Sequence, residues 1–135
     1  MQSAEVAAGV RLQQQGRTDQ AIARYRAILK RTPRNAEAHN WLGVALLEKG
    51  LLKEAAGAFR AAVAIQPGYA RASNNLGSTL AQMGDLALAL QEFSNGLKHS
   101  PNDPQLRANL GLALRNNGDA EAALLRAFWD FDHRE

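Results

Sequence analysis

One spacing of 34 residues recurs along the whole chain and restricts the folds open to it. This spacing relates Pro33, Pro67 and Pro101. It also relates two columns of glycine, one of leucine and one of alanine: Gly9, Gly43, Gly77 and Gly111; Gly16, Gly50, Gly84 and Gly118; Leu12, Leu46, Leu80 and Leu114; Ala21, Ala55, Ala89 and Ala123. A fixed period of this length indicates a stack of similar units, each packed on its neighbours. We predict a single domain, 1–135, with repeats at about 2–35, 36–69, 70–103 and 104–135.

Each unit is predicted to fold as two antiparallel helices. In the second unit, apolar residues at helical spacing place the first helix at about 36–49, with Asn35 as its N-cap. Gly50 ends that helix, and by the same register Gly118 ends the first helix of the fourth unit. A glycine inside a helix costs about 1 kcal/mol relative to alanine. The glycines of the Gly43 column therefore indicate a close approach between the two helices of each unit.

These positions resemble the tetratricopeptide repeat, whose pattern is W-x2-L-G-x2-Y, then A-x3-F, then a proline on the same period. The second and third units match it at Leu42, Gly43, Leu46, Ala55, Phe59 and Pro67, and at Leu76, Gly77, Leu80, Ala89, Phe93 and Pro101. The fourth unit has Ala127 in place of the aromatic residue, and Trp41 lies two positions after the family's tryptophan position. The resemblance implies an all-α, right-handed α-solenoid of antiparallel helix pairs, the TPR superhelix. It also implies a concave groove that binds peptides or partner proteins.

Composition and motifs exclude several classes of function. Hydrophobic residues make up 46% and charged residues 21% of the chain, as in a folded domain. There is no cysteine, and no nucleotide-binding, hydrolase or metalloprotease motif. We therefore expect no enzyme activity, no cofactor and no metal site. The first residues show neither a signal peptide nor a membrane span, which favours a cytoplasmic protein that does not contact the membrane.

The net charge of +3 comes from the first unit, which has seven basic and two acidic residues. Five of the basic side chains follow the outward positions of the second helix: Arg24, Arg26, Lys30, Arg31 and Arg34. No aromatic stacking residues alternate with them, so the pattern favours a solvated convex face over a nucleic-acid interface. A basic adaptor for nucleic acid is the lowest-ranked alternative.

Asparagines dominate the expected groove. Asn40 and Asn74 are one repeat apart, as are Asn75 and Asn109. A carboxamide both donates and accepts hydrogen bonds, so a column of them can bind the backbone of an extended peptide. This resembles the asparagine ladder in the repeat domain of O-linked N-acetylglucosamine transferases; the alternative is that the asparagines bond water or neighbouring helices. The predicted peptide-binding residues are Asn40, Trp41, Arg71, Asn74, Asn75, Ser78, Gln82, Asn109 and Arg115.

Two further features bear on what the groove could bind. Trp41 interrupts the asparagine column, either as an interface anchor or as a side chain packed on the next helix. Repeats of the chaperone-tail type clamp a terminal carboxylate with lysines and asparagines. Val6 and Val10 stand where the first unit would need such groups, which disfavours that specificity.

The last helix is apolar over more of its circumference than an outer helix of a stack should be. Its expected self-association residues are Leu124, Phe128, Trp129 and Phe131. We expect either a second copy, giving a homodimer, or the rest of a longer protein to cover them. The leading hypothesis is thus a non-enzymatic scaffold that binds a protein or peptide partner. The main alternative is a recruiting module of a larger enzyme such as a glycosyltransferase.

Overall fold

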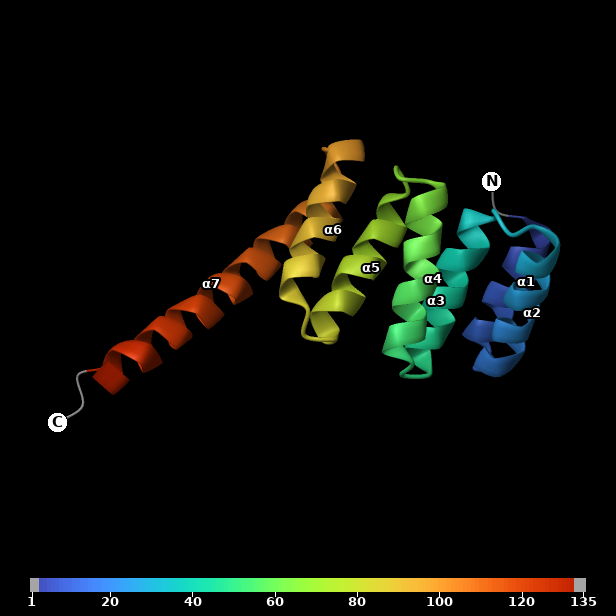
Figure 1. The fold of residues 1–135 in the computed structure, drawn as a ribbon. Coiled ribbons are helices and arrows are strands. Elements are labelled where there is room, and N and C mark those ends of the chain that lie inside the picture. The colour runs from blue at the N-terminus through green and yellow to red at the C-terminus, as the bar shows by residue number, and fades with distance from the viewer. Residues whose placement is uncertain (1–2, 133–135) are drawn as a thin grey trace.

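The computed structural model describes the backbone of residues 3–132 and the side chains of residues 3–118 and of Trp129. Throughout this part of the chain the structure is helical, with short turns and no strand (Figure 1). The helices are α1 (Ala4–Gln14), α2 (Thr18–Arg31), α3 (Ala36–Glu48), α4 (Leu52–Ile65), α5 (Ala70–Gln82), α6 (Leu86–His99) and α7 (Pro104–Asp132). The predicted all-α solenoid is confirmed.

Three antiparallel hairpins, α1–α2, α3–α4 and α5–α6, stand side by side in chain order (Figure 1). Each turn has a glycine in the left-handed region, with φ of +78° at Gly16 and Gly50 and +86° at Gly84. The chain then reverses through a hydrogen bond across the turn, as from the Leu51 amide to the Leu46 carbonyl at 3.0 Å. Asn35 caps α3 as predicted, because its side chain accepts from the Ala38 amide at 3.0 Å.

The core of each hairpin is an aromatic ring packed onto a helical glycine. Tyr25, Phe59 and Phe93 are almost fully buried, and each ring lies where a side chain at Gly9, Gly43 or Gly77 would be. A methyl group at any of these glycines would overlap the ring. The close helix approach expected from the glycine column is therefore present, and it explains why the sequence accepts the helical cost of glycine.

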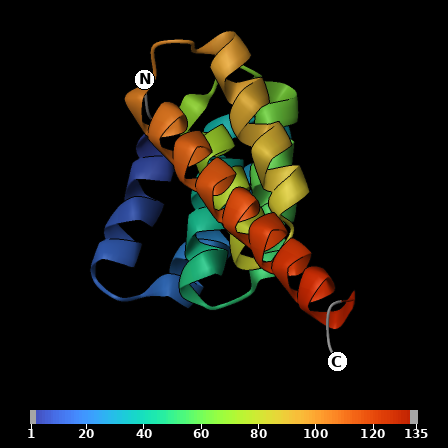
Figure 2. The ribbon, with the colours of Figure 1, turned by 90° about the vertical axis from the view of Figure 1, so that its left-hand side faces the viewer.

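The fourth unit departs from the expected hairpin. α7 runs without interruption from Pro104 to Asp132 through Gly118, which is helical and has no positive φ (Figures 1 and 2). The partner of the glycine explains the difference. Gly111 corresponds to Gly43 and Gly77, but the position sixteen residues later is Ala127, and none of the residues that the structure describes comes within 4 Å of where a Gly111 side chain would be. Without an aromatic ring to bury, a turn gains little and the helix continues.

Candidate functional site

The first helices of the units lie closer together than the second helices, and this gives the stack its curvature. α1 contacts α3, α3 contacts α5 and α5 contacts α7. Within the described part of the chain, α2, α4 and α6 make no such contacts with one another. The face formed by α1, α3, α5 and the first half of α7 is therefore the inner, concave one, as expected for the groove.

Four columns of side chains line this inner face, on the side of each first helix that points away from its hairpin partner. All are partly or fully exposed. We call this surface the groove; its columns are Ser3, Glu37, Arg71 and Gln105; Ala7, Trp41, Asn75 and Asn109; Val10, Val44, Ser78 and Leu112; and Gln14, Glu48, Gln82 and Asn116. Most are polar and few are charged, which suits a ligand held by its backbone.

The asparagines pair with one another across neighbouring helices. The Asn75 Nδ2 donates to the Asn40 Oδ1 at 3.0 Å, and the Asn109 Nδ2 donates to the Asn74 Oδ1 at 2.8 Å. Asn40 is 0% exposed and Asn74 is 8% exposed. The sequence-based assignment of Asn40 and Asn74 to the groove is therefore corrected. Both side chains are buried between neighbouring first helices, where they accept hydrogen bonds from Asn75 and Asn109.

Asn40 retains one unsatisfied group. Its Nδ2 is buried and has no hydrogen-bond partner among the residues that the structure describes. The Tyr69 side chain lies close by. Burial is the main cause that raises the pKa of the Tyr69 phenol, and the nearby Glu37 carboxylate raises it further. Tyr69 and Glu37 also line an open hollow of about 490 Å3 with Arg34. Because Glu37 belongs to the first groove column, this hollow adjoins the groove.

Replacing Asn75 by alanine is expected to lower the free energy of unfolding by about 1 kcal/mol, because the buried Asn40 Oδ1 would lose the hydrogen bond that it accepts from Asn75. Gln82→Ala on the same helix is the control, since Gln82 is exposed and its loss should change little. Urea unfolding followed by circular dichroism measures both. Equal stability of the two variants would show that the Asn75–Asn40 bond contributes nothing.

Trp41 lies in the same column as Asn75 and Asn109 and is half-buried against the hydrophobic core. Part of its ring therefore packs within the stack while part remains in the groove. Arg71 and Gln82 are exposed on α5, and Arg115 is exposed on α7 next to the groove columns. The structure thus brings Trp41, Arg71 and Gln82 to one concave face.

An apolar hollow between α5, α6 and α7 was not foreseen from the sequence. It has a volume of about 150 Å3 and includes the predicted groove residues Ser78 and Asn109. The other residues lining it are Ala81, Leu86, Phe93, Leu112, Ala113 and Asn116. The sequence holds one signal of this hollow, Leu112. It shares a column with Val10, Val44 and Ser78, so it adds an apolar side chain to the C-terminal end of the groove.

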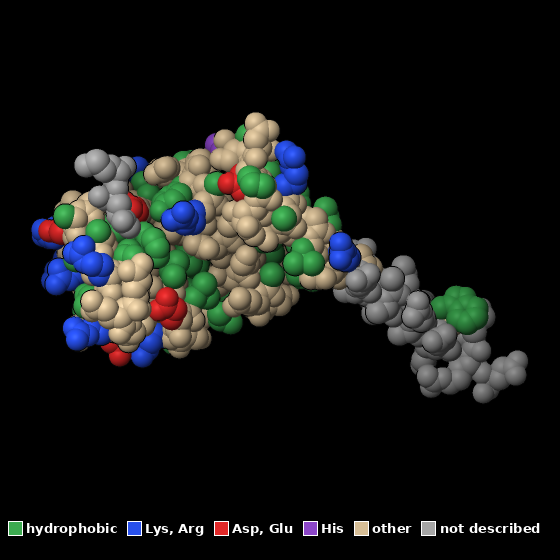
Figure 3. Space-filling model, turned by 180° about the vertical axis from the view of Figure 1, so that it is seen from behind, with side chains coloured by type: hydrophobic (Ala, Val, Ile, Leu, Met, Phe, Trp, Pro, Cys, Tyr) green, Lys and Arg blue, Asp and Glu red, His purple; other side chains and the backbone are tan. Residues whose placement is uncertain are grey.

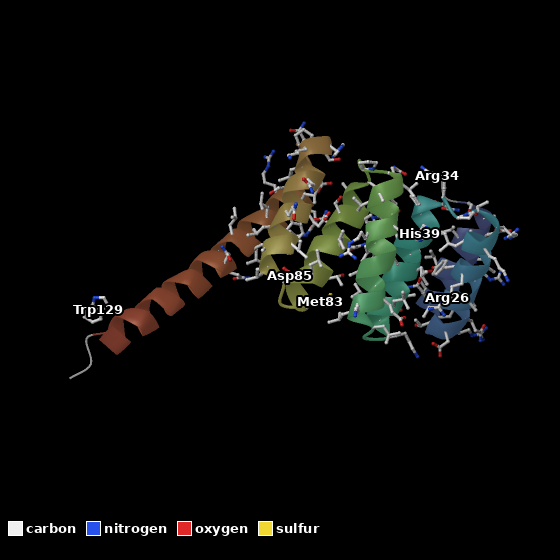
Figure 4. The ribbon with its side chains drawn as sticks, viewed as in Figure 1. Arg26, Arg34, His39, Met83, Asp85 and Trp129 are labelled. Carbon is white, nitrogen blue, oxygen red and sulfur yellow. The ribbon has the colours of Figure 1, made fainter. Side chains whose placement is uncertain are left out.

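The basic side chains of the first unit do not converge. Arg34 follows the end of α2 and Arg26 lies within that helix, and the two are well separated in Figure 4. Arg31 pairs with Glu5 at 2.5 Å. On the face shown in Figure 3, Lys and Arg side chains are spread over the N-terminal units with acidic ones between them. The arrangement offers no concentrated phosphate-binding site.

Two classes of site are absent from the part of the chain that the structure describes. It holds no group of three or more side chains suited to bind a metal ion. No helix there is both long and apolar enough to span a membrane. Of the predicted self-association residues, Trp129 is exposed, whereas the side chains of Leu124, Phe128 and Phe131 lie outside the described residues.

Comparison with known proteins agrees with this geometry. Two profiles of the tetratricopeptide repeat family match residues 6–70 and 46–106. No curated protein matches the chain. Among solved structures, the first such domain of Spaghetti (RPAP3) bound to the HSP90 peptide SRMEEVD is 20% identical, with a TM-score of 0.78 over 84% of this chain and 93% of that one.

Two further structures widen the comparison. The Sgt2 domain of Aspergillus fumigatus is 21% identical, with a TM-score of 0.81, and the match covers 87% of this chain and 80% of that one. An O-GlcNAc transferase from Thermobaculum terrenum is 26% identical, with a TM-score of 0.71 over 84% of this chain. Only 23% of the transferase is covered, so the likeness is confined to its repeats.

Proposed function

Because this chain belongs to the tetratricopeptide repeat family, we propose that it is a non-enzymatic scaffold that binds an extended segment of a partner protein in its groove. The supporting observation is the concave face itself, where Trp41, Arg71 and Gln82 are presented on adjacent first helices. Asn75 and Asn109 are already oriented by Asn40 and Asn74, so they would lose little freedom on binding. A cytoplasmic location remains part of this proposal.

The expected ligand is an extended peptide that does not depend on a terminal carboxylate. One structural neighbour binds an HSP90 peptide. In this chain, however, Val6 is fully buried and Val10 is partly buried at the positions where a carboxylate clamp would need amide or cationic groups. Asn75 and the exposed Gln82 offer carboxamides to a peptide backbone, and Leu112 offers an apolar contact. Contacts of these kinds favour backbone recognition with a few apolar anchors.

The groove is tested by a matched pair of double variants. Arg71→Glu with Gln82→Ala changes exposed groove residues and should weaken the binding of peptides selected from a random display library by at least about tenfold, without unfolding the chain. Arg26→Glu with Lys53→Ala changes exposed residues of α2 and α4, on the outer face, and should leave binding unchanged. Loss of binding in the second pair with retention in the first would contradict the groove as the binding site.

A recruiting module of a larger enzyme is the second candidate. It is supported by the likeness to the repeats of a glycosyltransferase. The paired carboxamides on adjacent first helices fit that function as well. A catalytic domain encoded in the same reading frame would favour it, and the groove would then serve to select the enzyme's protein substrates.

A further inference from the structure

The apolar hollow between α5, α6 and α7 exists because two side chains of α5 are small. Ser78 and Ala81 line it, and the residues one repeat earlier are Val44 and Leu47 on α3. Val44 and Leu47 are partly buried and pack against the hydrophobic core. Serine and alanine therefore leave open, at the boundary of the third and fourth units, a space that larger side chains occupy one boundary earlier.

The boundary between the first and second units is filled in another way. There Gln13 is the counterpart of Ala81, and Tyr25 is the counterpart of Phe93. The Tyr25 hydroxyl donates to the Gln13 Oε1, and the Gln13 Nε2 donates to Glu48 at 3.1 Å. A long polar side chain thus bonds the ring hydroxyl at that boundary. At the last boundary, by contrast, a small side chain faces a ring that has no polar group.

The chemistry of the hollow selects an apolar occupant. Its lining includes Phe93 and Ala113, which are both buried. None of the described residues that line it is charged. Its volume is about 150 Å3, and an apolar cavity of that size holds a molecule as large as benzene. The hollow therefore fits one apolar side chain, and it would leave a charged group without a partner.

The mouth of the hollow opens into the groove and carries hydrogen-bonding groups. Ser78 and Asn109, both partly exposed, belong to the groove columns. The Asn109 Nδ2 donates to the Asn74 Oδ1, and the Asn109 Oδ1 accepts from the Gln105 Nε2 at 3.3 Å. Because a carboxamide has two N–H groups and two acceptor lone pairs, these bonds leave Asn109 one of each for a peptide backbone. Leu112 at the same mouth is 54% exposed, so an occupant would also cover apolar surface that now faces water.

We propose that this hollow is the anchor pocket of the groove, and that it takes one side chain of the bound peptide, of the size and polarity of leucine, isoleucine, methionine or phenylalanine. Asn109 holds the backbone of the same stretch of peptide at the mouth. The inference rests on the proposed function, since it adds a side-chain preference to a ligand that the groove otherwise holds by its backbone. A few buried side chains carry most of the binding energy of an interface, so the pocket determines which peptides bind.

Filling the anchor pocket tests the proposal. Ser78→Val with Ala81→Leu gives α5 the two residues that α3 has at these positions, so this filled variant should fold as the parent does. Peptides selected on the parent from a random display library should share one apolar residue, and replacing it by alanine should weaken binding by at least about tenfold. The filled variant should bind the selected peptides at least about tenfold more weakly, and the same alanine replacement should then have less than about a twofold effect. Isothermal titration calorimetry measures all four combinations.

The matched control makes the same two substitutions on the exposed surface of α6. Ala87→Leu with Ser94→Val should bind the selected peptides as the parent does. The anchor pocket and the groove can fail separately. Peptides whose affinity falls with Arg71→Glu but is unchanged in the filled variant would overturn the anchor pocket and leave the groove in place. A library that yields no peptide for the parent chain would overturn both.

A second variant opens the anchor pocket instead of filling it. Leu112→Ala removes one wall at an exposed position, so the chain should stay folded while the affinity for the selected peptides falls by at least about threefold. Leu88→Ala is the control, because Leu88 is an exposed leucine of α6 that does not line the pocket. Equal affinity of the Leu112→Ala variant and the parent would overturn the proposal.

Discussion

Replacing Gly43 by alanine is expected to lower the free energy of unfolding by about 1–3 kcal/mol, because the new methyl group would occupy the position of the Phe59 ring. The ring is 0% exposed and cannot move into solvent. Gly57→Ala is the matched control: Gly57 is also inside a helix, but no described residue lies within 4 Å of its added side chain. That variant should gain about 0.5–1 kcal/mol.

Urea unfolding monitored by far-ultraviolet circular dichroism measures both alanine variants. If Gly43→Ala lowers the free energy of unfolding while Gly57→Ala raises it, the loss at Gly43 comes from packing and not from helix propensity. A double variant, Gly43→Ala with Phe59→Leu, should cost less than the two single changes added together, because the smaller leucine leaves room for the methyl group. Strict additivity would contradict the contact between Gly43 and Phe59.

The second large effect is expected at the joint between α7 and the stack. Leu106 is 0% exposed and its methyl groups lie against the position of Gly96 on α6. Leu106→Ala should cost about 2–5 kcal/mol, since it empties a closely packed site. Leu112→Ala on the same helix should cost less than about 1 kcal/mol, because Leu112 is 54% exposed.

Amide hydrogen exchange shows where the Leu106 effect acts. If Leu106 anchors α7, the Leu106→Ala variant will lose protection first in residues 104–118, while α3 and α4 remain protected, since units of a solenoid stabilise only their neighbours. Uniform loss of protection throughout the chain would contradict a local anchoring role.

The 34-residue spacing was enough to predict the three hairpins, because the repeated glycines occupy positions where the backbone or the packing requires a residue without a side chain. Glycine at position 50 enters the left-handed region, and glycine at position 43 admits an aromatic ring. The straight α7 was not predicted, although its cause is visible in the sequence. Gly118 continues the glycine column, but Ala127 stands where the second and third units have the aromatic ring that packs on a helical glycine.

The candidate site was predicted only in part, for a geometric reason. A period of 34 residues identifies equivalent positions, but it does not say which contacts cross from one unit to the next. The asparagine bonds span 35 residues, so they join a groove position on one first helix to an inner position on the first helix of the preceding unit. That one-residue offset is what buries Asn40 and Asn74 while Asn75 and Asn109 stay accessible.

The proposed peptide-binding groove on the first helices is tested most directly by amide chemical-shift mapping. A peptide selected from a random display library is titrated into the isotopically labelled chain. We expect the largest shifts on α3, α5 and the first half of α7, around Trp41, Arg71 and Ser78. Shifts confined to the outer faces of α2, α4 and α6 would contradict binding in the groove.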